Sequence, residues 1–461
     1  MADSGCEEAG VIIRGRETVV PETPTERRSF FLSCLDVVWR YVHYNQRVVF
    51  YEAVADEQTT VVARLKKSLA QCLVYYYPWC GRLTKEGRLA IDCNDAGVEF
   101  VEAFVDAPMS QLAHAGFQMR PLFWHLCQHI DHSKDNSPLL SIQVTFFCDG
   151  GLAVGISQSH VVADGQALWN FMCSWSECSR GVPLSSPPVH DRELLAVPNP
   201  SPEKAATWKF NATKEIESVD NGEESSISAG NASADRPQRS ASSDLVQCLF
   251  IMPSSAIRQL KAEDGGVHTS YEVMCAHLWK HITRARQRPS HEPTFFVVLA
   301  NCRNRVSPRL PSTFFGNAIA FDISESTSAR VCAEPLNATA ARIHATVVAI
   351  VQDGLAGFLN WLETPGNDFF PYILPQLPKG MSINVASSPR FPAYEVDFGW
   401  GKPSAVRSPR VPSLGEIVLF GGNPKLGEGD VEICVALPHD TLKRLLEDST
   451  FLAITPSSPF T

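Results

Sequence analysis

The alternation of hydrophobic and polar positions predicts a β-hairpin in the first half of the chain. Hydrophobic residues occupy every second position on both sides of the sequence Asp149-Gly150-Gly151, which has the composition of a tight turn. After Gly165 the hydrophobic residues return at helical spacing until Gly181, a typical helix end. Residues 157–165 therefore connect a strand to a helix. The alternating positions are Leu140, Ile142, Val144 and Phe146, followed by Leu152, Val154 and Ile156.

Similar patterns predict elements along both halves of the chain. Residues 60–77 are predicted to be a helix, because hydrophobic residues mark one face of it before Pro78 ends it. Further helices are predicted at 271–286 and 336–362. Strands rich in β-branched and aromatic residues are predicted at 47–51, 245–253, 295–299, 381–386, 416–419 and 431–436.

The length of the chain predicts two domains. A single hydrophobic core rarely grows beyond roughly 250–300 residues, and this chain has 461. Between residues 199 and 243, Pro, Ser, Asn, Glu and Gly dominate, which is typical of a solvated connector. We therefore predict an N-terminal domain at 1–194, a linker at 195–245 and a C-terminal domain at 246–461.

Charge and cysteine content restrict the partners and the compartment. Acidic residues outnumber basic ones by 10, which argues against nucleic acid or an anionic membrane as a partner. None of the 14 cysteines forms a C-x-x-C pair, so we expect reduced thiols and no metal site. The N-terminus is acidic and polar, unlike a leader, and no apolar run is long enough to span a bilayer. We expect a soluble, cytoplasmic monomer.

His160 is the candidate catalytic residue of the connection at 157–165. A neutral imidazole has an ordinary pKa of roughly 6.5 and can accept a proton from a hydroxyl or an amine near neutral pH. Three alternatives compete with a general base: a structural histidine, a metal ligand paired with Asp164, and a Ser-His-Asp triad. The triad lacks a Gly-x-Ser-x-Gly turn. Asp164 either fixes the imidazole or braces the loop.

A second motif, Asp397-Phe398-Gly399-Trp400-Gly401, lies in the other half of the chain. Two glycines that bracket a tryptophan indicate a tight, packed turn. Asp397 is either catalytic or a carboxylate that braces backbone or an arginine, and the pattern favours bracing.

Both motifs, in this order, resemble those of the plant BAHD acyl-CoA-dependent acyltransferases. The resemblance extends from Val11 to about Leu437 and implies an α/β fold of two chloramphenicol-acetyltransferase-like domains. Each domain would be a mixed sheet flanked by helices, with a tunnel at the interface. Three further sequences support it: Tyr77-Pro78-x-x-Gly81-Arg82-Leu83, Ala276-His277-Leu278-Trp279 and Phe315-Gly316-Asn317-Ala318.

The resemblance also implies a mechanism. His160 would remove the acceptor proton, and the acceptor would attack the thioester directly, so that acyl-CoA is a co-substrate and no bound cofactor is needed. Asp164 would be structural and paired with an arginine, for which Arg303 is the candidate. Asp397, Gly399, Trp400 and Gly401 would maintain the domain interface. For the anionic CoA, the candidate cations are Lys261, Lys280 and Arg284.

The acceptor side departs from that of the shikimate and quinate hydroxycinnamoyl transferases. Those enzymes carry a Thr-x-Trp pair before the second motif and an arginine farther upstream. Here the aligned segment is 385–391, and 370–378 holds no arginine, so a shikimate acceptor is not expected. The sequence Ser387-Ser388-Pro389-Arg390-Phe391 and His43-Tyr44-Asn45-Gln46 look more like the "defective in cuticular ridges" subgroup. Ser387 or Ser388 either donates to the oxyanion or shapes a turn.

The sequence thus predicts an O- or N-acyltransferase of specialised or cuticle metabolism, acting on a small-molecule acceptor. Two alternatives stay open: a binding, regulatory or elimination protein of the same fold, and a thioesterase.

Overall fold

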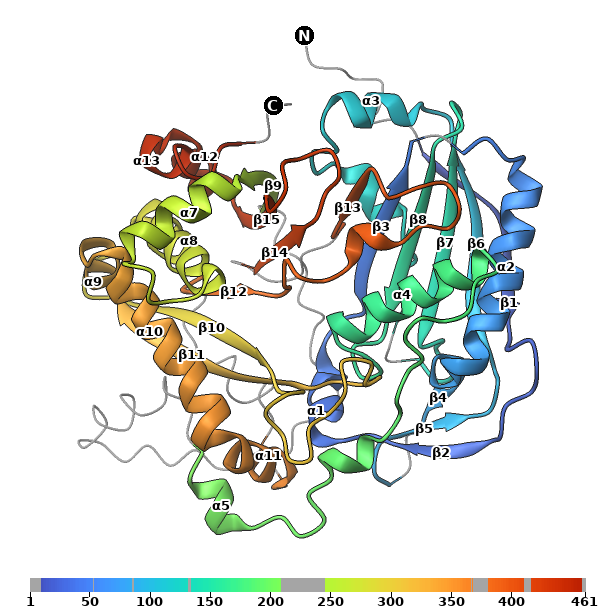
Figure 1. The fold of residues 1–461 in the computed structure, drawn as a ribbon, viewed down its shortest axis with the longest axis horizontal. Coiled ribbons are helices and arrows are strands. Elements are labelled where there is room, and N and C mark those ends of the chain that lie inside the picture. Colours follow the sequence, from blue (N-terminus) through green and yellow to red (C-terminus); the bar gives the residue numbers. More distant parts are fainter. Residues whose placement is uncertain are drawn as a thin grey trace.

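The structure, a computed structural model, describes residues 10–52, 54–84, 87–131, 134–208, 245–365, 367, 380–409 and 416–457. These residues form two six-stranded mixed sheets and one sheet of three strands. Figure 1 shows the first large sheet on the right and the second on the left, each with its helices. The predicted α/β fold with two mixed sheets flanked by helices is therefore confirmed.

The first sheet has the strand order β1-β6-β7-β8-β3-β13. β6 and β7 run parallel, and the other neighbours run antiparallel. The predicted hairpin is the central pair β7–β8. The strands are β1 (Val11–Val19), β3 (Asn45–Tyr51), β6 (Val98–Val105), β7 (Leu140–Phe147), β8 (Leu152–Gln158) and β13 (Ala405–Arg407).

Both faces of the first sheet are covered. The helices α2 (Gln58–Tyr75) and α4 (Gly165–Ser179) pack on one face, and residues 107–127 with α3 (Met109–His114) pack on the other (Figure 1). Every residue of β7 and β8 is consequently buried. Polar residues on the second face keep partners: the Gln143 amide donates to the His125 carbonyl at 2.8 Å. The end of β8 is therefore a rigid support for the residues that follow it.

The second sheet has the order β11-β10-β12-β14-β15-β9. β12 runs parallel to both of its neighbours, and the other pairs are antiparallel. The strands are β9 (Leu245–Met252), β10 (Pro293–Asn301), β11 (Ile319–Thr327), β12 (Ser382–Val385), β14 (Glu416–Gly421) and β15 (Val431–Pro438).

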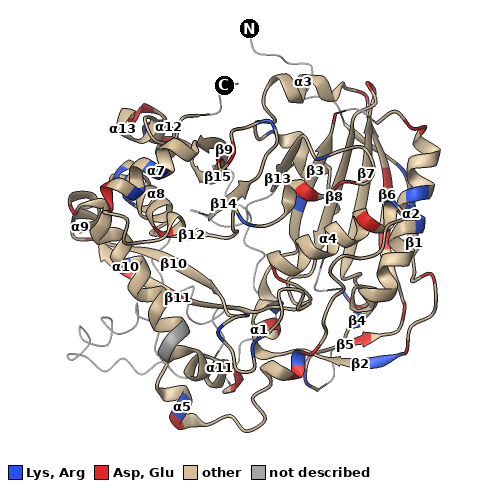
Figure 2. Ribbon diagram, in the orientation of Figure 1, with Lys and Arg blue, Asp and Glu red and all other residues tan. Residues whose placement is uncertain are grey.

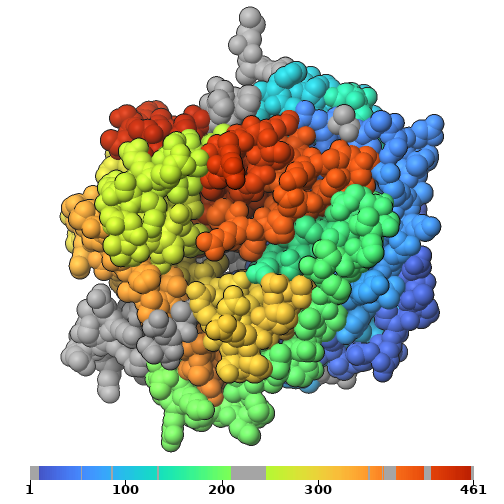
Figure 3. Space-filling view, viewed as in Figure 1, coloured from blue at the N-terminus to red at the C-terminus, as the bar shows by residue number. Residues whose placement is uncertain are grey.

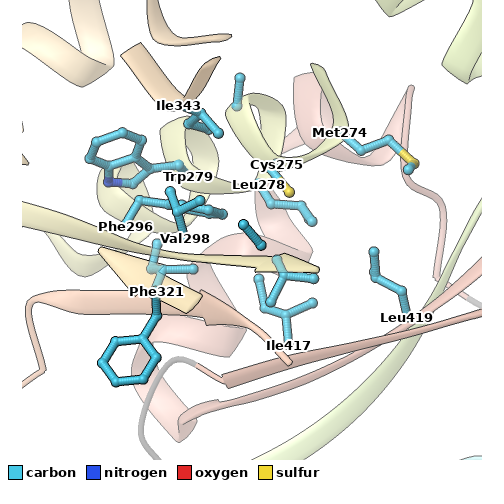
Figure 4. Close-up of a cluster of buried hydrophobic side chains, with 14 of the residues drawn as sticks. Met274, Cys275, Leu278, Trp279, Phe296, Val298, Phe321, Ile343, Ile417 and Leu419 are labelled. Atoms are coloured by element: carbon cyan, nitrogen blue, oxygen red, sulfur yellow. The ribbon is translucent and has the colours of Figure 1, made fainter. Parts of the chain in front are cut away.

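One face of the second sheet carries α8 (Ser270–Arg286) and α10 (Leu336–Val348). α8 begins with a capping box between Thr269 and Glu272, which satisfies free N–H groups of its first turn. Figure 4 shows side chains of α8, among them Leu278 and Trp279, directed towards the strands. The opposite face, through residues such as Val418 and Phe420, shares a buried cluster with the first domain. The second sheet therefore separates α8 from the first domain.

β13 crosses the predicted division of the chain, which stays a prediction. Its residues 405–407 fall in the segment assigned to the C-terminal domain, yet they pair with β3 at the edge of the first sheet. On this strand, buried Arg407 forms an ion pair of 3.0 Å with Glu432 of β15. The C-terminal half thus adds a strand to the first sheet, and a buried ion pair links that strand to the second sheet.

Shorter elements complete the fold. The small sheet has the order β2-β5-β4, with β2 (Arg28–Phe31), β5 (Ala90–Cys93) and β4 (Arg82–Leu83). The remaining helices of the described residues are α1 (Cys34–Val37), η1 (Val38–Tyr41), η2 (Tyr77–Cys80), η3 (Pro121–His125), η4 (Arg192–Leu195), α5 (Pro202–Ala206), α7 (Ser254–Glu263), α9 (Ser328–Ala333), η5 (Ala349–Gly354), α11 (Leu355–Glu363), η8 (Ala393–Glu395), α12 (His439–Glu447) and α13 (Ser449–Leu452).

Most predicted elements are present, and three differences are instructive. The helix predicted at 336–362 is divided by a π-helical segment, η5. β1 was not predicted, because this edge strand is largely exposed and its sequence lacks alternation. β6 and β11 were not predicted. Most of the predicted linker, 209–244, lies outside the described residues.

No helix among the described residues has both the length and the hydropathy to cross a membrane. Cytoplasmic location and the monomeric state stay predictions.

Candidate active site

His160 lies at the junction of the two domains. It follows the end of β8 by two residues, and the backbone N–H of Ser159 donates to the Leu139 carbonyl at 2.9 Å, which fixes the chain beside it. Gly165 begins α4, and a Cβ there would lie only 2.8 Å from the ring of Phe391. This contact brings the segment 385–391 of the C-terminal half against the first motif.

The hydrogen bonds of Asn317 determine the tautomer of His160. The Asn317 Nδ2 group donates to the Asp36 carboxylate at 2.9 Å and to the His160 carbonyl at 2.8 Å. Its Oδ1 is therefore the acceptor that lies 3.0 Å from His160 Nδ1. The proton of the neutral imidazole must then sit on Nδ1. No other described residue hydrogen bonds the ring, so Nε2 carries the available lone pair.

Burial lowers the pKa of His160 from its ordinary value, and nearby Arg47 acts in the same direction. A hydrogen bond to the backbone of His160 itself, the charge of Asp164 and the hydrogen bond to Asn317 oppose that shift without reversing it. His160 is therefore neutral at neutral pH and able to accept a proton.

Asp164 does not hydrogen bond the His160 ring; it forms a buried ion pair with Arg303. Arg303 donates to both carboxylate oxygens, at 2.7 and 2.9 Å, and both side chains are almost fully buried. Asp164 also accepts the backbone N–H groups of Ala167 and Ala318, so it caps α4 and holds the loop after Gly316. Burial alone would raise the pKa of Asp164, but Arg303 and these N–H groups hold it below its ordinary value. The predicted pairing with Arg303 is present.

A second buried ion pair supports the same loop. Arg192 lies 3.2 Å from Asp36 and also donates to the carbonyls of Val162 and Phe315. No function was predicted from the sequence for Asp36, Asn317 or Arg192. Two signals were present: the spacing Ser33-x-x-Asp36 of a capping box, and the sequence around Asn317.

Trp39, also missed, packs against His160. Its indole is stacked on the imidazole with ring centroids 4.0 Å apart and an interplanar angle of 14°.

The second motif forms a compact turn on the first domain. Asp397 Oδ1 accepts the N–H groups of Gly399 and Gly401 at 2.7 and 2.9 Å, and both glycines have positive φ, 106° and 90°. The buried Phe398 ring meets Trp175 of α4 edge to face at 4.6 Å. These contacts lie at the C-terminal end of α4, whereas His160 precedes its N-terminus; 15 residues of helix span about 22 Å. Asp397 therefore braces backbone, as its pattern favoured.

The two candidate serines contact backbone. Ser387 Oγ donates to the Leu419 carbonyl at 2.8 Å and accepts from its N–H, which ties the end of β12 to β14. Ser388 Oγ accepts from the N–H of Arg390 at 3.2 Å. Both serines therefore make the contacts expected of residues that shape a turn, one of the two roles considered for them from the sequence. The arginine-free segment 370–378 lies outside the described residues.

The candidate CoA-binding cations lie away from the domain junction. Lys261 donates to carbonyls at the end of α7, Lys280 donates to the Val331 carbonyl at 2.7 Å, and Arg284 pairs with Asp448 at 3.4 Å. Lys280 and Arg284 are on α8, which the second sheet separates from the first domain. Figure 2 shows the basic residues of α7 and α8 at the left of the view, away from α4. Their role in CoA binding stays a prediction that these contacts do not favour.

A cavity of about 560 Å³ lies beside η1. Val37, Val38 and Arg40 line one side of it, and Leu362 and Glu363 of α11 line another. In the space-filling view the surface is hollowed near the centre, where the two halves of the chain meet (Figure 3). The implied tunnel stays a prediction. Within the described ranges, no group of three or more His, Cys, Asp or Glu residues is arranged to hold a metal ion.

Known structures share this architecture. Vinorine synthase superposes with a TM-score of 0.72 at 21% identity, covering 98% of this chain and 100% of that one. TRI101 of F. sporotrichioides, complexed with Coenzyme A and T-2, has a TM-score of 0.71 at 19% identity and covers 92% and 99%. At this identity the likeness shows the fold, and the predicted chloramphenicol-acetyltransferase-like domains are confirmed.

Sequence comparison shows the family. A hydroxycinnamoyltransferase of Narcissus pseudonarcissus is 28% identical over 442 residues, covering 93% of this chain and 97% of that protein. BAHD acyltransferase DCR of Arabidopsis thaliana is 28% identical over 474 residues, covering 95% and 92%. The model of the Transferase family matches residues 9–452. This chain therefore belongs to the Transferase family, that of the BAHD acyltransferases.

Proposed function

We propose that the protein is an acyl-CoA-dependent O- or N-acyltransferase in which His160 is the general base. The observation that carries this proposal is the Nδ1 hydrogen bond to Asn317, because it leaves the Nε2 lone pair as the proton acceptor. A lowered pKa keeps the ring neutral before the reaction. Acyl-CoA is the co-substrate; its support is family membership and the Coenzyme A named in a structure of the same fold.

The reaction needs one base and no acyl-enzyme. His160 Nε2 takes the proton of the acceptor hydroxyl or amine as the acceptor atom forms a bond to the thioester carbon. The carbonyl electron pair moves to oxygen and gives a tetrahedral oxyanion. When C=O re-forms, the C–S bond breaks, and the leaving CoA thiolate takes the proton from the His160 imidazolium. The products are an ester or amide and CoA, and the base is restored.

Asp164 and Arg303 serve this site as positioning residues. Their ion pair holds the start of α4 and the loop that carries Asn317, so it fixes the two residues that orient the imidazole. Neither is proposed to touch the substrate. Asp397, Gly399, Trp400 and Gly401 are proposed to maintain the packing of the two halves at the far end of α4.

The acceptor is proposed to be a small molecule of specialised or cuticle metabolism. The support is similarity to BAHD acyltransferase DCR and the segment 385–391, which lacks the Thr-x-Trp pair. Phe391, which packs on Gly165, places this segment beside the first motif.

The test is acceptor-dependent thiol release. Purified protein is offered acetyl-, hydroxycinnamoyl- and long-chain acyl-CoA with a panel of alcohols and amines, and products are identified by mass spectrometry. His160→Ala is expected to lower kcat by about 10²- to 10⁴-fold, the usual contribution of a general base, with a nearly unchanged thermal melt. Exposed His291→Ala is the matched control and should keep full activity.

Each alternative has its own result. Full turnover by His160→Ala contradicts the base assignment. Thiol release that needs no acceptor indicates a thioesterase, and acyl-CoA binding without release indicates a binding protein of the same fold.

A further inference from the structure

The stack of Trp39 on His160 crosses the domain junction. Trp39 belongs to η1 and is buried in the hydrophobic cluster of the second sheet, whereas His160 is carried by the first sheet. The two rings are 4.0 Å apart and nearly parallel, and Phe321 of β11 meets the indole edge to face at 6.0 Å. The indole thus covers one face of the imidazole and is itself held from the side.

The stack is also fixed through the backbone. Asp36 lies three residues before Trp39, and its carboxylate accepts both the backbone N–H and the side-chain amide of Asn317, each at 2.9 Å. The same Asn317 accepts from His160 Nδ1. His160, Asn317, Asp36 and Trp39 are therefore linked: the imidazole cannot turn without breaking its hydrogen bond to Asn317, and the indole is held by its ring contacts with His160 and Phe321.

We propose that Trp39 is a positioning residue of the transferase: its indole fixes the plane of the His160 ring, so that Nε2 faces the acceptor, and it stabilises the imidazolium formed during proton transfer. This inference rests on the proposed role of His160 as the base. It adds a residue outside the His160-x-x-x-Asp164-Gly165 motif to the proton-transfer machinery.

The chemistry follows from the electrostatics of the indole. The face of an aromatic ring is negative and attracts a cation within about 6 Å, most strongly for tryptophan and in a desolvated site. Neutral imidazole gains little from this face, while imidazolium gains more. The transition state, in which the ring acquires charge, is therefore stabilised relative to the ground state.

The charged groups around the ring define what else could influence it. Asp164 at the start of α4 favours the imidazolium, Arg47 of β3 opposes it, and Asp36 acts through Asn317. A substitution of Trp39 by another apolar residue leaves all three in place. Any change in the pKa of His160 in such a variant is then caused by the loss of the indole.

The experiment compares Trp39→Leu and Trp39→Phe with the wild type. Leucine keeps the site apolar but has no π face, and phenylalanine keeps a weaker one. Trp208→Leu is the matched control: that indole is 6% exposed against 8% for Trp39, and it packs on Phe358, so that Phe358 and Phe321 separate it from Trp39. The readouts are ¹⁵N NMR titration of the His160 ring and the pH profile of kcat/KM.

For Trp39→Leu we expect the pKa of His160 to fall by roughly 0.5 to 1.5 pH units, and kcat on the alkaline plateau to fall roughly 2- to 30-fold. Trp39→Phe should lie between Trp39→Leu and the wild type in both readouts. Trp208→Leu should change neither. The NMR titration needs no substrate and reads out the folded protein, so Trp39→Phe decides the question if Trp39→Leu is too unstable.

Two results overturn the inference. An unchanged or raised His160 pKa in Trp39→Leu shows that the indole only fills space. An equal loss of activity at every pH, with an unchanged titration, shows a purely structural role. Both differ from failure of the proposed function, which would appear as full turnover by His160→Ala.

Discussion

The two sequence motifs of this protein are built in opposite ways. Asp164 of the first motif is fully buried, and both of its carboxylate oxygens accept hydrogen bonds from Arg303, a residue of the other half of the chain. Asp397 of the second motif is half-buried and accepts two N–H groups from its own turn. One carboxylate joins the domains beside His160. The other folds a local turn whose aromatic residues pack on α2 and α4.

The difference separates a motif that supports chemistry from one that supports packing. Around Trp400, the polar contacts are an exposed ion pair between Arg64 and Asp56 and the indole N–H bond to Asp56 at 3.2 Å. Around His160, the polar contacts are buried or partly buried, and those of Asn317, Asp36 and Arg192 join segments far apart in the chain. Changes at the first motif should therefore be costly, and equivalent changes at the second should be mild.

The largest effect is expected for Asp164→Asn. The substitution removes the charge that compensates the buried Arg303 guanidinium, and breaking a buried pair costs about 3–5 kcal/mol. We expect urea unfolding to show this loss in the free energy of unfolding, together with loss of thiol release. Asp56→Asn, at the exposed ion pair of the second motif, is the control and should lose about 1 kcal/mol or less.

The double variant Asp164→Asn, Arg303→Met sharpens this result. Removing the unpaired cation should restore part of the lost stability, since the remaining cost is then lost packing and hydrogen bonds. A loss below about 1 kcal/mol in Asp164→Asn alone would contradict the view that this pair joins the domains.

An intermediate effect is expected for Gly401→Ala. Its φ of 90° is strained for alanine, although no atom lies within 4 Å of the added Cβ. The cost should be about 1–2 kcal/mol of stability, with kcat/KM nearly unchanged because the turn lies at the far end of α4 from His160. Gly15→Ala is the control, because Gly15 has no positive φ and equally open surroundings. A loss of activity without a loss of stability would assign the turn a direct role.

The sequence predicted local structure better than contacts between distant segments. The hairpin β7–β8 and the helix α8 were predicted because their periodicity and ends are encoded within a few residues. The pair of Asp164 and Arg303 was reached only through the family resemblance, since 139 positions separate the two.

The remaining parts of the site could not be derived from patterns. Asp36 and Asn317 are 281 positions apart, and the local signals at each residue do not predict that the two side chains meet. Trp39 lies within the short helix η1, whose hydrophobic residues are typical of any buried segment. β13 has three residues and gives no periodic signal, so its pairing with β3 in the first sheet could not be predicted from its sequence.

The smallest effect is expected when the same chemical change, aspartate to asparagine, is made at the second motif. In Asp397→Asn the side-chain Oδ1 still accepts from Gly399 and Gly401, and only the charge assistance of these bonds is lost. We expect a loss of about 1 kcal/mol or less and unchanged turnover. Asp397→Ala, which leaves two N–H donors without this acceptor, should cost about 1–3 kcal/mol. If Asp397→Asn instead destabilises the protein as much as Asp164→Asn, the charge of Asp397 must stabilise a buried partner. The contrast between the two motifs would then be wrong.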